Sequence, residues 1–312
     1  MKAFSYDRFG GGDVLHASEL PDPVPGKGEV VVAVQARSIN LIDIRVRSGT
    51  MGLLVNKRFP KVPGADLAGE VIAVGPGAEG FKVGDRVFGA ADPFKGGAFA
   101  ERIALAALNL CPIPHGLAPD VAAALPIAGL AALQSLRDLG QLKAGQSVLI
   151  HGATGPVGLF AVQLAKRTGA EVIAVGSSGL DTARRLGADR VVDYRNGPGL
   201  PKGLRFDVIL NLSGKLPFAV GRAMLKPDGR LVEPSPTIPL FIGSKLGNLF
   251  RRQKHMALAA AVRHADLKLL ADLAATGALE PVLAASFPFD ASREAYALVE
   301  RGGVIGKVVV TG

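Results

Sequence analysis

The sequence has one cysteine, no tryptophan and no long apolar run. Because Cys111 is the single cysteine among 312 residues, neither an intrachain disulfide nor a zinc cage of cysteines can form. The longest stretch without charged or polar side chains, residues 121–133, contains a proline and is shorter than the roughly 20 residues of a membrane helix. The first twenty residues lack the apolar run of a secretory signal. We therefore expect a cytoplasmic protein without a membrane partner.

Aromatic residues are also scarce, at 5% of the chain, whereas basic residues are in excess. Lys and Arg number 36 against 27 Asp and Glu, which gives a net charge of +9. Such a balance attracts anions, for example the phosphates of a cofactor, a nucleic acid or a membrane surface. Few aromatics leave few platforms for stacking bases, so we expect no nucleic-acid partner, although RNA binding stays open as an alternative. The densest basic cluster, residues 251–255, is interpreted as a solvated loop.

The order of the predicted elements divides the chain into two parts. Closely spaced strand patterns at 29–39, 66–75, 84–90 and 98–105, without helices between them, are typical of a barrel or sandwich. From Asp120 onward helix and strand patterns alternate, which predicts a parallel sheet with crossover helices. The expected order is helix 120–138, strand 147–152, helix 157–168, strand 171–176, helix 180–187, strands 190–194 and 206–212, helix 217–225, strand 229–234, helix 265–276, and a last helix from Asp290 before a closing strand.

A glycine-rich turn connects the strand 147–152 to the helix 157–168. The turn has glycines at positions 152, 155 and 158. In a dinucleotide-binding turn, one glycine permits the tight turn, a second permits close approach of the pyrophosphate, and a third permits packing of the helix on the strand. The N-terminus of the helix supplies free N–H groups and the positive end of a dipole. Pro156 removes one donor but fits the first helical turn. The candidate cofactor-binding residues of this turn are Gly152, Thr154, Gly155, Pro156 and Val157, and a turn without a ligand is the alternative.

The end of the strand 171–176 bears on the choice of cofactor. An NAD site places Asp or Glu there to bind the ribose hydroxyls, whereas this strand ends in Gly-Ser-Ser-Gly. Because this segment has no carboxylate, nothing in it would repel a 2′-phosphate. The hydroxyls of Ser177 and Ser178 can donate hydrogen bonds to such a phosphate. Tyr194, at the end of the next strand, can contact the same phosphate or the adenosine. The sequence therefore favours NADPH, with helix capping as the alternative role of the two serines.

Over nearly its whole length the chain resembles a medium-chain dehydrogenase/reductase of the zinc-free quinone oxidoreductase group. The resemblance depends on the glycine turn and on the segments 40–49 (NLIDIRVRSG), 59–71 (FPKVPGADLAGEV), 84–87, 97–101, 125–129 and 306–310. Residues 58–66, 277–282 and 287–289 are most similar to alkenal/enone reductases and chloroplast-envelope quinone oxidoreductase homologues. The family implies an α/β fold. A GroES-like catalytic domain would span 1–118 and 266–312, and a Rossmann-like doubly wound sheet would span 119–265, in a homodimer.

The same resemblance implies the chemistry. Zinc relatives have Cys where this chain has Asn40, and His in the motif that reads Gly64-Ala65-Asp66 here, so no metal ligand is expected. Hydride would pass from NADPH to the β-carbon of an unsaturated ketone or aldehyde, or to a quinone, and the acceptor would be small and hydrophobic.

The resemblance also assigns roles to individual residues. Arg45 takes the place of a lysine that contacts cofactor and substrate in enone reductases, and would stabilise charge on the carbonyl oxygen. Asn40 would shape the loop that carries Arg45, or take part in the chemistry. The residues implied to line the nicotinamide and its ribose are Leu212, Ser213, Ser235, Val304 and Ile305. Tyrosines of ordinary quinone oxidoreductases are absent at 45 and 51, which keeps a non-enzymatic NADPH-binding sensor or partner-binding protein as the alternative function.

Overall fold

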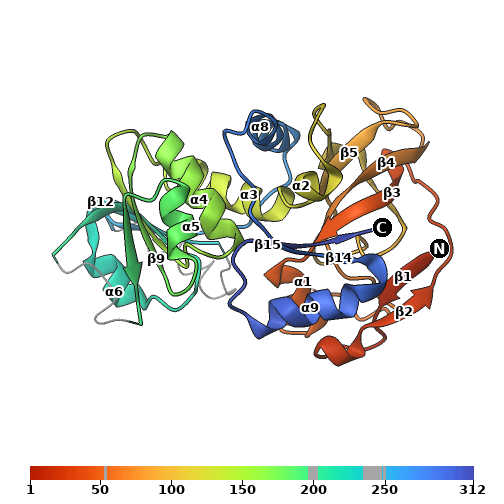
Figure 1. The fold of residues 1–312 in the computed structure, drawn as a ribbon, viewed down its shortest axis with the longest axis horizontal. Helices are drawn as coiled ribbons and strands as arrows, with labels where there is room; N and C mark the ends of the chain where they lie inside the picture. Colours follow the sequence, from red (N-terminus) through yellow and green to blue (C-terminus); the bar gives the residue numbers. More distant parts are fainter. Residues whose placement is uncertain (53–54, 196–202, 235–247, 249–250) are drawn as a thin grey trace. The chain divides into compact units, whose positions relative to one another are not determined.

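The computed structural model describes residues 1–52, 55–195, 203–234, 248 and 251–312, and the chain divides into two compact units (Figure 1). The first unit comprises Met1–Ile127 and Val262–Gly312, and the second comprises Ala128–Ala261. Each unit has its own sheet and its own buried apolar core. The β-rich first unit and the doubly wound second unit confirm the predicted α/β class.

The second unit is built on a six-stranded parallel sheet in the order β10-β9-β8-β11-β12-β13. The strands are β8 (Ser147–His151), β9 (Glu171–Gly176), β10 (Arg190–Asp193), β11 (Phe206–Asn211), β12 (Leu225–Glu233) and β13 (Lys254–Ala257). The central strands are rich in Val, Ile and Leu because both faces of a parallel sheet are covered. The strand order reverses between β8 and β11, and open α/β sheets bind ligands at the carboxyl ends of the strands at such a point.

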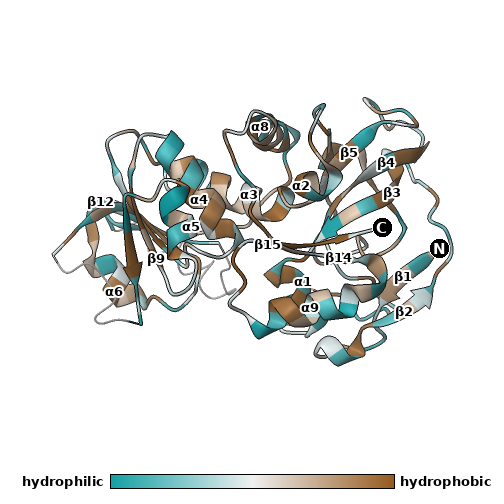
Figure 2. Ribbon diagram, in the orientation of Figure 1, coloured by the Kyte–Doolittle hydropathy of each residue, from teal (hydrophilic) through white to brown (hydrophobic). Residues whose placement is uncertain are grey.

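The helices of this unit are α3 (Pro126–Gln134), a π-helical turn η4 (Ser135–Leu139), α4 (Pro156–Arg167), α5 (Leu180–Arg185) and α6 (Phe218–Ala223). Helix α3 begins at the end of the first unit. Helix α4 is amphipathic, and Leu159, Phe160 and Val162 are buried while its last turn carries the exposed Lys166 and Arg167 (Figure 2). This apolar stripe explains why a helix follows the glycine turn.

The first unit contains a seven-stranded sheet in the order β14-β15-β3-β4-β5-β7, with β6 paired to β3, and a separate two-stranded sheet. Strand β15, from the far end of the chain, pairs with β3 and so lies beside the N-terminal strands. The strands are β1 (Lys2–Ser5), β2 (His16–Glu19), β3 (Glu29–Ser38), β4 (Asp66–Val74), β5 (Arg86–Ala90), β6 (Arg102–Ala106), β7 (Leu110–Pro112), β14 (Leu283–Pro288) and β15 (Lys307–Thr311).

Short helices surround this sheet. They are η1 (Gly12–Val14), α1 (Leu41–Arg47), η3 (Ala107–Asn109), α2 (Pro119–Ala123), α8 (His264–Ala275), η5 (Phe289–Ala291) and α9 (Ser292–Arg301). Helix α9 packs on β14, β15 and α1 and buries Ala295 and Tyr296. The single cysteine, Cys111, is buried in β7 as an ordinary apolar side chain.

Three local predictions were wrong. The helix expected over 120–138 is divided into α2, α3 and η4, because Pro126 cannot continue the hydrogen bonding of a preceding turn. The segment around Arg45 is the helix α1 rather than a loop. The basic cluster 251–255 is not simply a solvated loop, because Lys254 and His255 begin the edge strand β13. No helix in the described part of the chain has the length and apolar character needed to cross a bilayer.

Candidate functional site

The glycine turn joins β8 to α4 at the carboxyl edge of the parallel sheet. Gly152 has a φ of +92°, which favours glycine, and its N–H and that of Ala153 donate to the carbonyl of Val175 at 2.9 and 3.0 Å. A Cβ on Gly158 would lie 2.4 Å from the Gly152 oxygen, so glycine lets α4 pack against the turn. A Cβ on Gly155 would meet nothing closer than 3.8 Å, so this side of the turn is open.

The first turn of α4 faces the same open side. Gly155 caps the helix and Pro156 is its first residue, as expected for a proline without an N–H. The N–H groups of Val157 and Gly158 have no carbonyl four residues earlier inside the helix, and together with the dipole they form an anion site. Thr154 lies beside the end of β9, because a Cβ on Gly176 would lie 3.2 Å from its hydroxyl. The turn therefore fits the pyrophosphate of a dinucleotide.

The loops after β9 and β10 meet beside this turn. The N–H of Tyr194 donates to the Gly176 carbonyl at 3.1 Å, and Arg195 Nη2 donates to the Ser177 carbonyl at 2.8 Å. The Arg195 guanidinium also binds both carboxylate oxygens of Asp193, at 2.7 and 3.0 Å. Sequence reasoning missed Arg195, although a basic residue next to Tyr194 at the end of a strand was a visible signal.

The two serines after β9 do not cap the following helix. The N-cap of α5 is Gly179, with a left-handed φ of 74° and no capping side chain. Among the residues that the structure describes, neither Ser177 nor Ser178 has a hydrogen-bond partner for its hydroxyl. Both hydroxyls therefore remain free to bind a ligand.

A chain of hydrogen-bonded side chains crosses the carboxyl edge from β8 to β13. His151 Nδ1 lies 2.6 Å from Ser213 Oγ, and Ser213 Oγ lies 3.3 Å from Asn211 Oδ1. Asn211 Nδ2 donates to Glu233 Oε1 at 2.6 Å, and Glu233 Oε2 lies 2.9 Å from His255 Nε2. We define these five side chains as the edge chain. Only Ser213 was singled out from the sequence, because the other members meet through sheet pairing rather than spacing.

Two members of the edge chain have shifted pKa values. Burial and the nearby Lys215 lower the pKa of His151. Burial alone would raise the pKa of Glu233, but hydrogen bonds from His255 and Asn211 lower it below its usual value. The half-buried Leu212 is held beside the chain, since its N–H donates to the His151 carbonyl at 2.9 Å. Ser235 lies outside the described residues.

In the first unit, helix α1 presents its charged residues in different directions. Asn40 precedes the helix, and its N–H donates to Asp43 Oδ2 at 2.8 Å. Asp43 and Arg47 are one turn apart and buried, and Arg47 forms an ion pair with Glu300. Burial raises the pKa of Asp43 to about 7, although the N–H of Asn40 acts in the opposite direction. Arg45 is half-buried, and no described residue forms a hydrogen bond or ion pair with its guanidinium.

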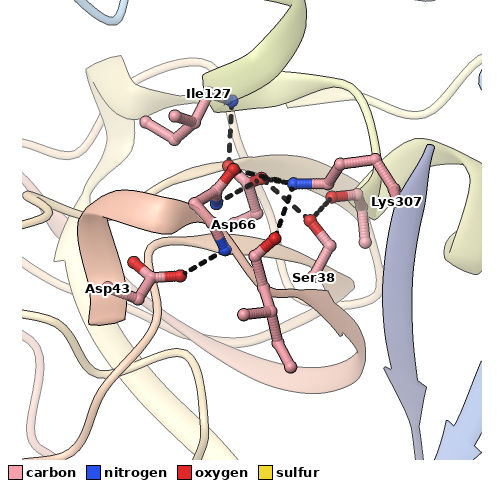
Figure 3. A network of polar contacts seen from close by, with 8 residues as sticks. Ser38, Asp43, Asp66, Ile127 and Lys307 are labelled. Atoms are coloured by element: carbon pink, nitrogen blue, oxygen red, sulfur yellow. Dashed lines mark hydrogen bonds and ion pairs between the residues drawn. The ribbon is translucent and has the colours of Figure 1, made fainter. Parts of the chain in front are cut away.

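A buried network also binds the side chain of Asn40. Figure 3 labels its members Ser38, Asp66, Ile127 and Lys307. Asp66 Oδ2 accepts from Asn40 Nδ2 at 2.8 Å and from Lys307 Nζ at 3.0 Å, and Lys307 Nζ also donates to Asn40 Oδ1 at 2.7 Å. Ser38 Oγ donates to Asp66 Oδ2 at 2.8 Å, and the Ile127 N–H donates to Oδ1 at 2.9 Å. The side chains of Asp66 and Lys307 are 0% and 1% exposed. The network therefore holds a fully desolvated ion pair that needs its hydrogen bonds.

The predicted residues are thus distributed over both units. The turn residues 152–157, Ser177, Ser178, Tyr194, Leu212 and Ser213 belong to the second unit, and Asn40, Arg45, Val304 and Ile305 belong to the first. Val304 and Ile305 are half-buried just before β15, where a Cβ on Gly306 would lie 2.3 Å from the Val282 oxygen. No three His, Cys, Asp or Glu side chains within the described ranges are grouped closely enough to hold a metal ion.

Comparison with known proteins matches both parts of the chain. A model described as an alcohol dehydrogenase GroES-like domain matches residues 26–115, and one described as a zinc-binding dehydrogenase matches residues 186–310. Quinone-oxidoreductase QR1, chloroplastic, of Triphysaria versicolor is 34% identical, over 99% of this chain and 98% of that protein. The structure of the quinone oxidoreductase from Coxiella burnetii is 30% identical with a TM-score of 0.91, and covers 100% of this chain and 99% of its own. The Escherichia coli quinone oxidoreductase complexed with NADPH is 25% identical with a TM-score of 0.86, over 100% of both chains.

Proposed function

Because this chain belongs to the quinone oxidoreductases of the medium-chain dehydrogenase/reductase family, we propose that it is an NADPH-dependent, metal-free oxidoreductase of conjugated carbonyls or quinones. The observation that carries the proposal is the open glycine turn before α4, with Gly155 uncrowded and the N–H groups of Val157 and Gly158 without a partner among the described residues. A nicotinamide cofactor fits this turn, and a related structure contains NADPH. When bound, NADPH supplies a hydride to the acceptor.

Preference for NADPH over NADH is supported by the loops after β9 and β10. The hydroxyls of Ser177 and Ser178 have no partner among the described residues, and the segment Gly176-Ser-Ser-Gly179 at the end of β9 contains no carboxylate. Arg195 adds a guanidinium that already contacts the Ser177 loop, and Tyr194 is 48% exposed beside it. A dianionic 2′-phosphate suits this set of donors, because charge-assisted hydrogen bonds are the strong ones.

Replacement of Arg195 by methionine is expected to raise the KM for NADPH roughly tenfold or more, the value of a hydrogen bond to a charged group. The KM for NADH should not change, because NADH has no 2′-phosphate. Steady-state kinetics with both cofactors measure the effect. Arg190→Met is the matched control, since this exposed arginine lies at the amino end of β10, the strand that precedes Arg195, and is paired with Glu171. Equal effects of Arg195→Met on NADPH and NADH would remove Arg195 from the phosphate site.

The residues around Asn40 do not fit a catalytic zinc, although one matching model is described as zinc-binding. Asn40 stands where zinc relatives have Cys, and Asp66 belongs to the segment that corresponds to their His motif; both side chains are bound to the Lys307 ammonium. A metal ion beside this ammonium would be repelled, and the resident cation already satisfies the Asp66 carboxylate. We therefore assign no step of the reaction to a metal.

Arg45 is the group that supports reduction of a carbonyl compound. Hydride addition to a conjugated C=C or to a quinone places negative charge on an oxygen, and a cation aimed at that oxygen lowers the barrier. Arg45 is an unpaired cation in the part of the chain that the structure describes, whereas its neighbour Arg47 is committed to Glu300. An arginine is always charged, so the proton for the α-carbon comes from another group.

NADPH consumption by the purified chain, with a short acyclic enone and a quinone as acceptors and NADH in parallel, tests the function. We expect oxidation of NADPH with at least one acceptor and slower oxidation of NADH. Tight NADPH binding without turnover on any enone or quinone would instead favour a non-enzymatic sensor or partner-binding protein. A hydrophobic acceptor, a homodimer and a cytoplasmic location stay predictions, and the Triphysaria relative is named as chloroplastic.

A further inference from the structure

Helix α1 ends in a tight turn that satisfies the carbonyl of Arg45. The Thr50 N–H donates to the Arg45 carbonyl at 3.1 Å. The Gly49 N–H donates to the Val46 carbonyl, also at 3.1 Å, and Gly49 has a left-handed φ of 78°. These two hydrogen bonds around a left-handed glycine form a Schellman motif, a common end of helices. Arg45 therefore belongs to the last turn of α1, whose carbonyls have no partner inside the helix.

Two hydroxyl groups reinforce the same carbonyl. Ser48 Oγ lies 3.1 Å from the Arg45 oxygen, and Thr50 Oγ1 lies 3.0 Å from it. A carbonyl oxygen only accepts hydrogen bonds, so the hydroxyls are the donors. The two hydroxyl oxygens are 3.1 Å apart, so either hydroxyl can serve the carbonyl if the other is removed. Three donors thus converge on the backbone of the residue whose guanidinium has no partner among the described residues.

The inner side of the same turn is held in a different way. Val46 is buried, and the buried Arg47 forms an ion pair with Glu300. Successive residues of an α-helix are about 100° apart around its axis, so the burial of these two side chains does not itself fix Arg45. Ser48 is half-buried and Thr50 is exposed, so their hydroxyls hold the turn from its outer side.

A helix as short as α1 depends on its ends. It has seven residues, and isolated helices of that length are marginal in water. The Asp43 carboxylate binds the N–H of Asn40 at the first end, and the hydroxyls of Ser48 and Thr50 act at the last one. Without these hydroxyls the outer side of the last turn is free to fray, and the long side chain of Arg45 moves with it.

We propose that Ser48 and Thr50 are positioning residues for the reduction, because their hydroxyls hold the backbone of Arg45 so that its guanidinium meets the carbonyl oxygen of the acceptor. The inference rests on the proposed function, in which Arg45 stabilises negative charge on that oxygen. Neither hydroxyl takes part in the chemistry, and both act through Arg45.

Steady-state kinetics of Ser48→Ala/Thr50→Val with NADPH and an enone or quinone tests this. The variant removes both hydroxyls and keeps the backbone N–H of residue 50. We expect kcat to fall about tenfold, well inside the roughly 10²-fold that a misplacement of about 1 Å costs. The dissociation constant of NADPH should stay unchanged. Ser48→Ala/Thr50→Ser restores one hydroxyl and should recover most of the turnover.

Combination with Arg45→Ala separates positioning from a general loss of structure. If the hydroxyls act through Arg45, the triple variant should turn over no more slowly than Arg45→Ala alone, because residues that act as a unit are not additive. An equal loss in both backgrounds would mean that the hydroxyls only stabilise the fold, and would overturn the positioning role.

Thr276→Val is the matched control. Thr276 Oγ1 donates to the Asp272 carbonyl at 2.9 Å in the last turn of α8, so the variant removes the same kind of hydrogen bond from a helix without a proposed role in the reaction. Its kcat should equal that of the parent chain. If the double variant does not fold, Thr50→Val, at an exposed position, takes its place with an expected loss of about threefold, near the lower value of one neutral hydrogen bond.

A kcat equal to that of the parent chain in the folded variant without the hydroxyls would overturn the positioning role alone. Absence of turnover of any enone or quinone by the parent chain would overturn the proposed function as well.

Discussion

Arg45→Ala is expected to reduce turnover of an enone or quinone by about 10²–10³-fold, the loss found when one donor to a developing oxyanion is removed. Helix α1 directs Asp43 and Arg47 into the core, and leaves Arg45 half-buried without a partner in the described chain. NADPH affinity should change little, because the pyrophosphate and adenosine contacts that we propose lie on the turn before α4 and the loops after β9 and β10. Steady-state kcat and a separately measured NADPH dissociation constant distinguish the two effects.

The conservative variant sharpens this test. Arg45→Lys keeps a cation at the same helical position and should retain most of the turnover, although the geometry of a guanidinium and an ammonium differ. Unchanged turnover in Arg45→Ala would exclude Arg45 from the mechanism. Equal loss in the alanine and lysine variants, with normal stability, would show that the side chain acts by shape rather than by charge.

Asp66→Asn should lower the free energy of unfolding by about 3–5 kcal/mol, because it leaves the Lys307 ammonium buried without a countercharge. Urea denaturation measures the loss. Combining Asp66→Asn with Lys307→Met removes both charges and keeps a side-chain oxygen at position 66 for the donors of Ser38 and Ile127, so it should recover a large part of the loss. Asp272→Asn is the control: its partner Lys268 is 61% exposed, and we expect a loss of less than about 1 kcal/mol.

If Asp66→Asn lowered the free energy of unfolding by no more than the control Asp272→Asn does, the buried Lys307 ammonium would not need its countercharge. Such a result would mean that water or a rearranged Asn40 compensates Lys307. Because Asn40 shares hydrogen bonds with both members of the pair, a destabilised network should also disturb the start of α1, and with it the position of Arg45.

Local sequence signals predicted the features that depend on neighbouring residues. The glycine turn, Pro156 at the first position of α4 and the β-rich beginning of the chain follow from short patterns, and the structure has them. The start of α1 was also readable, because Asn40 and Asp43 have the spacing of a capping box, but the segment was interpreted as a loop. Pro126 likewise marked the end of α2.

Long-range contacts account for what sequence patterns could not predict. Asp66 and Lys307 are 241 residues apart and meet because β15 and β4 both pair with β3. Asn211 and Glu233 meet because β11 and β12 are neighbours with matched carboxyl ends. Strand β13 was not predicted because it has only four residues and begins with Lys254 and His255, so its sequence does not alternate between apolar and polar residues. Pairing of strands, rather than residue preference, assembles these groups.

Deuterium transfer shows whether the hydride of NADPH reaches the β-carbon of a conjugated carbonyl. With NADPH deuterated at both C4 positions and a short acyclic enone, we expect a saturated ketone with one deuterium on the β-carbon, formed more slowly when deuterated NADH is the donor. A product without deuterium at that carbon would contradict direct hydride transfer to the conjugated bond. Absence of any product from the enone and from a quinone, while NADPH still binds, would contradict the enzymatic assignment itself.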